Sequence, residues 1–497
     1  MLLLVTGCES SGAPPPREAA PVKASVPVAP PAPVADATTN IHPADYIGPD
    51  KCGTCHADEH ARWRTSLHRR MNQQVSPEAV IGDFDDAHVP YAGGELHLTH
   101  DATGYAMTTA KAARTTHYRI TRTIGVRGLQ EYVGIEDGQT EEVRLPFAWW
   151  PRLGRWVPQP YFDTWLGDEA KFDAYAPVRE PWAERCPWCH STYPFEQRIA
   201  RSSGRKKLGH GLEQFFTSAP QGERLGVEQQ VTTGISCESC HLGGKSHAAG
   251  GPIDFVPRGA APVAGAPVRR PFAEEKHDAR IINTICSSCH SGPSPKLADG
   301  TSLRNSREGP DLAASSCTGL ACTDCHDPHK GGSDEARSIA ACASCHAGIA
   351  SDPKHAHHKA VNCLDCHMPK VVMGLDHFVR THRISSPVHV TASEPNACNL
   401  CHLDRSLSWA AEALADYGAK IPRDAAWPEL EAGTVWLTGK RPHLRVIAAF
   451  AYARSPLGTR AKLEPGLTDP LAYVRAWTKF AIEDIVKAKI DVPKLVH

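Results

Sequence analysis

The sequence lacks two features that would define its class at once: a long apolar run and an excess of one charge. After the first few residues, no apolar stretch of the 497-residue chain is long enough to span a bilayer. Lysine and arginine number 54 against 55 aspartates and glutamates, a formal net charge of −1. We therefore expect no membrane-spanning helix, no nucleic-acid partner and no strong overall field that steers a charged ligand.

Cysteine and histidine, by contrast, are abundant, with 18 and 27 copies. Sixteen of the cysteines fall in eight copies of the pattern Cys-x-x-Cys-His. The cysteines are Cys52, Cys55, Cys186, Cys189, Cys237, Cys240, Cys286, Cys289, Cys322, Cys325, Cys342, Cys345, Cys363, Cys366, Cys398 and Cys401, and the histidines are His56, His190, His241, His290, His326, His346, His367 and His402. A zinc half-site or a redox dithiol also uses two such cysteines, but neither requires the histidine every time.

The pattern is the attachment signature of haem c. Its two thiols add to the vinyl groups of one porphyrin, and its histidine binds the iron from the proximal face. The sequence thus predicts eight covalently attached haems c, and a periplasmic or cell-surface location because this attachment takes place outside the cytoplasm. From Cys286 to His402 the motifs follow so closely that the haems themselves are expected to form the core.

The segment from Cys366 to Lys370, Cys-His-Met-Pro-Lys, is followed by Asp-His-Phe-Val-Arg-Thr-His from Asp376 to His382. Together they resemble the multihaem c-type cytochromes of the hydroxylamine oxidoreductase and pentahaem nitrite reductase superfamily. The resemblance extends over residues 46–403, and the motif count is similar to that of octahaem members. Nitrite reductases of this superfamily often replace the active-site motif histidine by lysine, whereas all eight motifs end in histidine here.

Nineteen histidines lie outside the motifs, and distal ligation of haem iron is one reason for such an excess. The segment from Trp63 to His68 resembles the Trp-x-x-Ser-x-His segment that follows the first haem in related cytochromes, where His68 would be a distal ligand. A surface histidine is the alternative. His247 ends a glycine-containing turn after the third motif that resembles a Cys-His-Gly-Pro-Gly-x-x-His segment of related proteins. The predicted distal ligands are His68, His247, His329, His355, His358, His377 and His382, with His117 or His88 as the eighth. For His88 and His117 a purely structural role is the alternative.

The order of segments follows from changes in composition. Val5-Thr6-Gly7-Cys8 resembles a bacterial lipobox, which predicts a lipid on Cys8, with a chance cysteine as the alternative. The apolar segment before Cys8 is short for a signal peptide and has no basic residue. The predicted segments are 1–8, a lipoprotein-type signal; 9–45, a Pro/Ala-rich linker; 46–83, the first haem segment; 84–165, a β-rich insert; 166–405, a multihaem domain with haems two to eight; and 406–497, an α-helical domain resembling HEAT repeats.

The fold is expected to be mostly α, with sparse secondary structure around a haem core and a small antiparallel β insert. In the insert, Leu96 and Leu98 alternate with polar residues, and Asp137-Gly138 marks a hairpin turn. The aromatic residues between Phe147 and Trp165 suit packing against porphyrin or an ordinary protein core, and both alternatives stay open.

After Ser406 the composition changes to Ala/Leu-rich segments that predict helices over 407–417, 444–452 and 471–486. Asp469-Pro470 is typical of a helix start, and the residues that follow resemble the second-helix entry of a HEAT repeat. A plain helical tail is the alternative. Cys317 belongs to no motif, and we expect a free buried thiol there, with a reactive or intermolecular cysteine as the alternative.

Three functions compete on the sequence alone. The favoured one is electron transfer along eight haems, with redox proteins such as other cytochromes or a quinol-oxidising complex as partners. The second is a multihaem oxidoreductase acting on a small nitrogen or sulfur oxyanion at one open haem. The third is a structural role as a haem filament or scaffold, which a lipid anchor on Cys8 disfavours.

Overall fold

The computed structural model describes residues 39–162, 172–197, 226–253, 255–258, 271–331, 334–356, 358, 361–392, 394–422, 424 and 427–491. Cys8, most of the predicted linker and Trp165 lie outside these residues. Among the described residues no helix combines the length and apolar character needed to cross a membrane. The folded body includes Asn40, before the predicted start at residue 46, because its buried side chain bonds the backbone of Val256 and Arg258.

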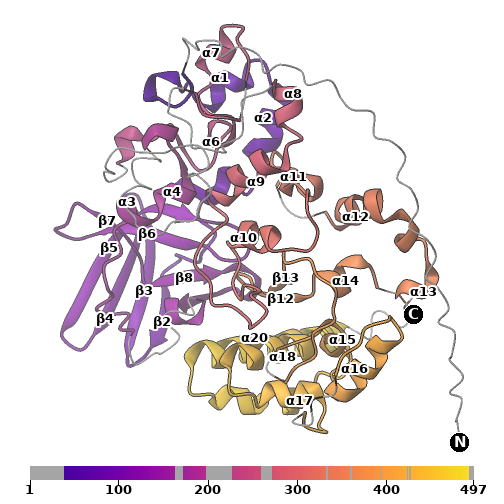
Figure 1. The fold of residues 1–497 in the computed structure, drawn as a ribbon. Helices are drawn as coiled ribbons and strands as arrows, with labels where there is room; N and C mark the ends of the chain where they lie inside the picture. Colours follow the sequence, from indigo (N-terminus) through magenta and orange to yellow (C-terminus); the bar gives the residue numbers. More distant parts are fainter. Residues whose placement is uncertain are drawn as a thin grey trace, which may run out of the picture. The chain divides into compact units, whose positions relative to one another are not determined.

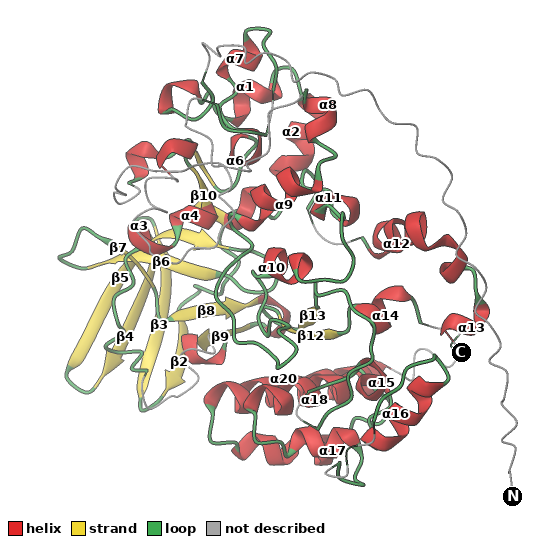
Figure 2. Ribbon diagram, viewed as in Figure 1, coloured by secondary structure: helices red, strands yellow, loops and turns green. Residues whose placement is uncertain are grey.

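The β insert is one antiparallel seven-stranded sheet (Figure 2). Its strands are β1 (Asn72–Gln74), β2 (Ala87–Tyr91), β3 (Gly94–Asp101), β4 (Gly104–Lys111), β5 (Arg114–Ile124), β6 (Glu131–Glu136) and β7 (Glu142–Arg144). Strands β2 to β7 follow in order, and β1 pairs with β5. The predicted alternation holds, since Leu96, Leu98 and Met107 are fully buried on one face. β1 extends the sheet to residues before the predicted insert.

The hairpin of β8 (Phe147–Trp150) and β9 (Arg155–Pro158) shares a core with the C-terminal helices. These helices are α16 (Leu407–Ala415), α17 (Ala432–Leu437), α18 (Pro442–Ala453), α19 (Arg460–Leu463) and α20 (Ala472–Asp491). The ring of Trp150 packs 4.3 Å from Phe480 and 5.7 Å from Trp477. This part of the aromatic segment is therefore protein core. The structure places helices where they are predicted, and the resemblance to HEAT repeats stays a prediction.

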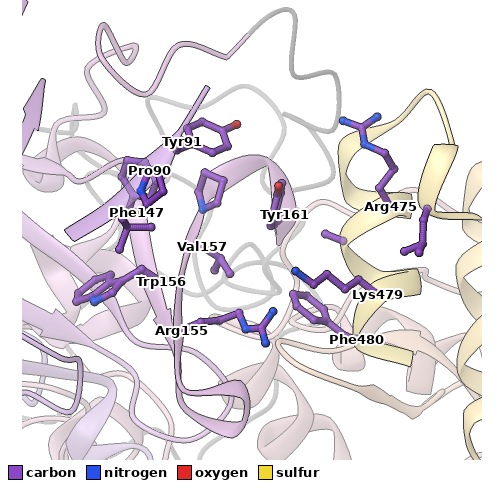
Figure 3. Close-up of a pocket in the computed structure, with 14 residues that line it drawn as sticks. Pro90, Tyr91, Phe147, Arg155, Trp156, Val157, Tyr161, Arg475, Lys479 and Phe480 are labelled. Atoms are coloured by element: carbon purple, nitrogen blue, oxygen red, sulfur yellow. The ribbon is translucent and has the colours of Figure 1, made fainter. Parts of the chain in front are cut away.

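A pocket of about 330 Å³ lies where β9 and α20 meet (Figure 3). Aromatic rings such as Trp156 and Phe480 line it together with the cations Arg155, Arg475 and Lys479. The Arg155 guanidinium is 3.1 Å from the Glu483 carboxylate, so one of these cations already has a partner. No motif cysteine or histidine lines the pocket.

The motif-bearing part of the chain consists of short helices joined by loops (Figure 1). The helices are α1 (Pro49–Gly53), α2 (Ala57–Arg64), α3 (Trp182–Arg185), α4 (Pro187–His190), α6 (Glu238–His241), α7 (Lys245–Ala248), α8 (Phe272–Glu275), α9 (Ala279–Ser287), α10 (Glu308–Ala313), α11 (Cys322–Cys325), α12 (Glu335–Ala350), α13 (Pro353–Ala356), α14 (Cys363–His367) and α15 (Ala397–Cys401). Two small two-stranded sheets accompany them, β10 (Ser191–Thr192) with β11 (Thr232–Thr233) and β12 (Lys370–Met373) with β13 (Phe378–Arg380). Short 3₁₀ turns are η1 (Pro43–Asp45), η2 (Arg69–Met71), η3 (Pro151–Leu153), η4 (Gln159–Tyr161), η8 (Val227–Gln229) and η9 (Glu464–Thr468).

Apolar burial differs sharply between the two helical regions. The 16-residue helix α12 has no buried residue, and its Ile349 side chain is 48% exposed. The 12-residue helix α18 has eight buried residues. The polypeptide around α12 therefore contributes little core of its own, as the sequence predicts for the haem-bearing part.

Candidate haem sites

Most motifs are built on a turn of helix that ends at or just before the histidine, whereas in the sixth motif α12 is kinked at His346 and continues to Ala350. The backbone N–H of His56 donates to the Cys52 carbonyl at 3.0 Å, and equivalent bonds of 2.9–3.0 Å occur in the motifs at His241, His290, His326 and His402. The chain leaves helical geometry at the histidine, for example at His56 with φ −114° and ψ 55°. One helical turn brings two thiols and one imidazole to the same side of the chain, as attachment to a single porphyrin requires.

Five motif histidines face a histidine from outside the motifs. The ring centres are 6.0 Å apart for His56 and His247, 6.3 Å for His241 and His329, 6.1 Å for His326 and His382, 6.1 Å for His367 and His355, and 6.1 Å for His402 and His358. With a metal–nitrogen bond of about 2.0 Å on each side, two imidazole centres lie roughly 6 Å apart. The spacing therefore fits an iron ion held between each pair.

Hydrogen bonds at Nδ1 orient several of these rings. Nδ1 of His247 bonds the Gly251 carbonyl at 3.0 Å, and Nδ1 of His367 bonds the Ser385 carbonyl at 3.0 Å. An imidazole whose Nδ1–H donates to a carbonyl presents the lone pair of Nε2, which is the nitrogen free to bind a metal. The donor chemistry of these residues thus fits haem iron.

His290 of the fourth motif interacts electrostatically with His68. Burial, followed by the charge on His290, lowers the pKa of His68, whose Nδ1 lies 3.4 Å from the Pro328 carbonyl. On the His290 side, a 2.9 Å hydrogen bond between Nδ1 and the Glu308 carboxylate raises the pKa of His290 to about 9. Glu308 is a carboxylate partner of the kind that orients metal-binding histidines.

The last five motif helices contact one another in the order of the sequence. α9 contacts α11, α11 contacts α12, α12 contacts α14, and α14 contacts α15. Their cysteines lie correspondingly close: burial and then the Cys363 and Cys325 thiols raise the pKa of Cys342. Burial and then the Cys398 thiol raise that of Cys366 to about 11. The fourth to eighth sites therefore form one continuous series.

The first three motifs join this series at the fourth. The Cys52 thiol of the first motif interacts with the Cys237 thiol of the third, and this interaction raises the pKa of Cys52. The Cys240 thiol of the third motif acts electrostatically on Cys286 of the fourth. The indole N–H of Trp188, inside the second motif, donates to the Ser288 carbonyl, inside the fourth, at 2.8 Å.

Glu238, within the third motif, connects that motif to the first. Its buried carboxylate accepts hydrogen bonds from the backbone N–H groups of Ile47, Gly48 and Gly244 at 2.9–3.0 Å. Burial raises the pKa of Glu238, which those three bonds oppose. A sequence reading centred on cysteine and histidine misses both Glu238 and Glu308, because a single carboxylate carries no pattern that marks its partner.

Two motif histidines and three predicted distal ligands are not brought together with a partner for haem ligation among the described residues. Among the described residues, no histidine ring is paired with His190 of the second motif or His346 of the sixth, while His210 and His357 lie outside those residues. The predicted distal ligand His377 instead bonds the Asp376 carboxylate at 2.5 Å and is 48% exposed. The alternatives His88 and His117 sit on the outer face of the large sheet: Nδ1 of His117 bonds Thr108, and His88 bonds Glu95.

Cys317 is partly exposed, so the prediction that its thiol is buried is wrong. The loop around it, between α10 and α11, has exposed neighbours at Ser316 and Thr318. The thiol belongs to none of the motif turns. Its presence near Cys342 is one of several influences that raise the pKa of that cysteine, after burial and the thiols of Cys363 and Cys325.

Comparison with known proteins finds only distant similarity. No protein-family model matches the chain, and no curated protein matches it. The crystal structure of the outer cell wall cytochrome OcwA aligns with a TM-score of 0.40 and 14% identity, over 89% of this chain and 100% of that chain. The octaheme sulfite reductase MccA of Wolinella succinogenes, form II, aligns with a TM-score of 0.34 and 15% identity, over 92% of this chain and 85% of that chain. At these scores the function must be argued from the motifs and their geometry.

Proposed function

We propose that the chain is a multihaem c-type cytochrome that carries electrons along eight covalently bound haems outside the cytoplasm. The observation that carries the proposal is the contact series of motif helices, in which five motif histidines face a second histidine at 6.0–6.3 Å. The haems would supply the one-electron chemistry. The protein supplies their spacing and their axial ligands.

Histidine on both faces suits a conduit rather than a catalyst. Two strong axial ligands keep an iron six-coordinate in both redox states, so little rearrangement accompanies electron transfer. They also exclude substrate from the metal. The proposed ligand sets are the five ring pairs, His56 with His247, His241 with His329, His326 with His382, His367 with His355, and His402 with His358. For the fourth motif we propose His290 with His68, which interact electrostatically.

The contacts define a route for electrons. It runs through the first, third, fourth, fifth, sixth, seventh and eighth sites, with the second site beside the fourth. The first and eighth sites would then exchange electrons with redox partner proteins such as other cytochromes or a quinol-oxidising complex. A lipid on Cys8 would hold the protein at a bacterial membrane.

The proposal predicts eight haems per chain, with at least the six paired irons low-spin in the ferric protein. Intact-protein mass gives the number of covalent haems, and the absorbance of the alkaline pyridine complex gives it independently. Electron paramagnetic resonance of the oxidised protein counts low-spin irons. Seven or fewer haems in fully matured protein, or fewer than six low-spin irons, contradicts the assignment.

A second candidate is the oxidoreductase, and the second motif favours it. His190 is partly buried and has no described histidine ring opposite it, and desolvation lowers its pKa. Two charged side chains also act on His190: the Glu131 carboxylate raises its pKa and the Arg144 guanidinium lowers it. Arg144 is ion-paired with Glu131 and Glu180, so the oxyanion reading rests on the open face of this haem and not on a free cation.

Carbon monoxide separates the two candidates. A conduit alone predicts that the fully reduced wild-type protein binds little carbon monoxide. An open second site predicts binding of carbon monoxide at the haem of His190 together with steady turnover of nitrite, hydroxylamine or sulfite. The measurement is an optical titration followed by an assay with reduced dye as electron donor. Stoichiometric binding of carbon monoxide together with turnover would show that the protein is an oxidoreductase and not only an electron conduit.

A further inference from the structure

The outer face of the β2–β3 hairpin carries two histidines directly opposite each other. In the antiparallel register His88 of β2 pairs with His97 of β3. Their imidazole rings stack with centres 4.1 Å apart and an angle of 19° between planes. Cross-strand neighbours on one face of a sheet are held at this spacing by the ladder itself, so the pair is fixed by rigid backbone rather than by a loop.

Asp86 directs a carboxylate oxygen at both rings. Its Oδ1 lies 2.6 Å from Nε2 of His97 and 3.8 Å from Nε2 of His88. Asp86, directly before strand β2, has φ 54°, a left-handed conformation that aspartate tolerates better than most residues. The three donor atoms all lie within 4.8 Å of one another.

Glu95 orients the same cluster from the neighbouring strand. Its Oε1 is 2.9 Å from Nδ1 of His88, so the carboxylate accepts the Nδ1–H and presents the lone pair of Nε2 toward Asp86. A carboxylate behind a histidine is the usual partner of a metal-binding imidazole, because it fixes both the tautomer and the ring orientation. An ion pair between Asp86 and His97 explains one contact, but not the second ring directed at the same oxygen.

We propose that Asp86, His88 and His97 form a binding site for a divalent transition-metal ion, with Glu95 as a positioning residue. With bonds of about 2.0–2.2 Å in tetrahedral geometry, donor atoms lie roughly 3.4 Å apart, and the observed 2.6 and 3.8 Å bracket that value. Two imidazoles and one carboxylate suit Zn²⁺, Ni²⁺ and Cu²⁺ rather than Mg²⁺ or Ca²⁺. Three protein ligands leave a coordination position for water or for a ligand from another molecule.

The test uses the full-length haem protein after treatment with chelator. Equilibrium dialysis against Zn²⁺, with zinc and iron counted by mass spectrometry, is expected to give one more zinc per wild-type chain than per His97→Ala or His88→Ala chain. Glu95→Gln is expected to weaken binding by about tenfold or more while keeping the stoichiometry. With Cu²⁺, nitrogen couplings from two imidazoles are expected in the wild-type spectrum and are lost in both alanine variants.

His100→Ala is the matched control. His100 lies on the same strand as His97, is exposed, and stacks on Tyr105 at 4.1 Å without a carboxylate between them. The His100→Ala variant should therefore bind as much zinc as wild type. The side chains of His88 and His97 are 49% and 32% exposed, so their replacement should leave the fold intact. An unchanged haem spectrum verifies the folding of the variants. Equal zinc binding by wild type and His97→Ala, or no zinc bound by wild type, overturns the proposal.

Discussion

Replacing His382 by alanine is expected to convert one low-spin haem of the protein into a site that binds carbon monoxide. His382 faces His326 of the fifth motif at 6.1 Å, so its removal leaves that iron with one protein ligand. The reduced variant should bind one more carbon monoxide per chain than wild type. Its ferric spectrum should show one additional high-spin iron. Optical titration and paramagnetic resonance measure the two changes.

His377→Ala, at the other end of strand β13, is the control. His377 is also a candidate by sequence, but its imidazole bonds Asp376 and no motif histidine is paired with it among the described residues. Its removal should leave carbon monoxide binding and spin state unchanged. Should both variants open a haem, or neither, the pairing of His382 with His326 would be the wrong ligand set.

Replacing Cys342 and Cys345 together by alanine is expected to remove one haem and expose α12 and its neighbours to proteolysis. No residue of α12 is buried by the polypeptide, so this helix has little apolar packing to retain it without a porphyrin. The motif also lies between the fifth and seventh sites in the contact series. We therefore expect the electron route to be interrupted as well, with slow reduction of part of the haem population.

The C-terminal helices supply the internal reference for that experiment. α18 and α20 bury aromatic and aliphatic side chains such as Phe450 and Trp477 against each other. They should resist protease equally in wild type and in the double variant. Limited digestion with peptide mapping locates the first cuts, which are expected within or beside α12. Wild-type resistance at α12 after loss of the haem would show that haem is not its core.

Local features of the sequence predicted local structure well. The hairpin turn predicted at Asp137-Gly138 joins β6 to β7, and Gly138 has the positive φ of 76° that such a turn requires. Asp469 accepts a hydrogen bond from the Leu471 backbone at the start of the last helical segment. By contrast β1 was not predicted, since Asn72-Gln73-Gln74 has no alternation and joins the sheet through its backbone ladder.

The pairing of distal histidines could not be predicted, because it depends on loops that cross between motifs. His355 faces His367 of the motif that follows it, while His358, only three residues later, faces His402 of the last motif. His355 and His358 lie at nearly the same distance along the chain before the seventh motif, so their positions in the sequence do not distinguish them. His377 resembles them in sequence, but Asp376 beside it offers a closer partner. As iron ligands these histidines stay predictions.

Each haem with a proposed ligand pair takes its two axial histidines from different parts of the chain, and this has a consequence for the biogenesis of the protein. On the proposed ligation, the haem attached at Cys52 and Cys55 receives its second axial ligand from His247, so that ligand set stays incomplete until the third motif has been secreted. The fourth haem reaches back to His68, whereas the fifth must wait for His382. Attachment can therefore follow the emerging chain, but the final coordination is completed out of sequence. A polypeptide stalled during export would present reactive, ligand-deficient haems to the attachment machinery and to its chaperones.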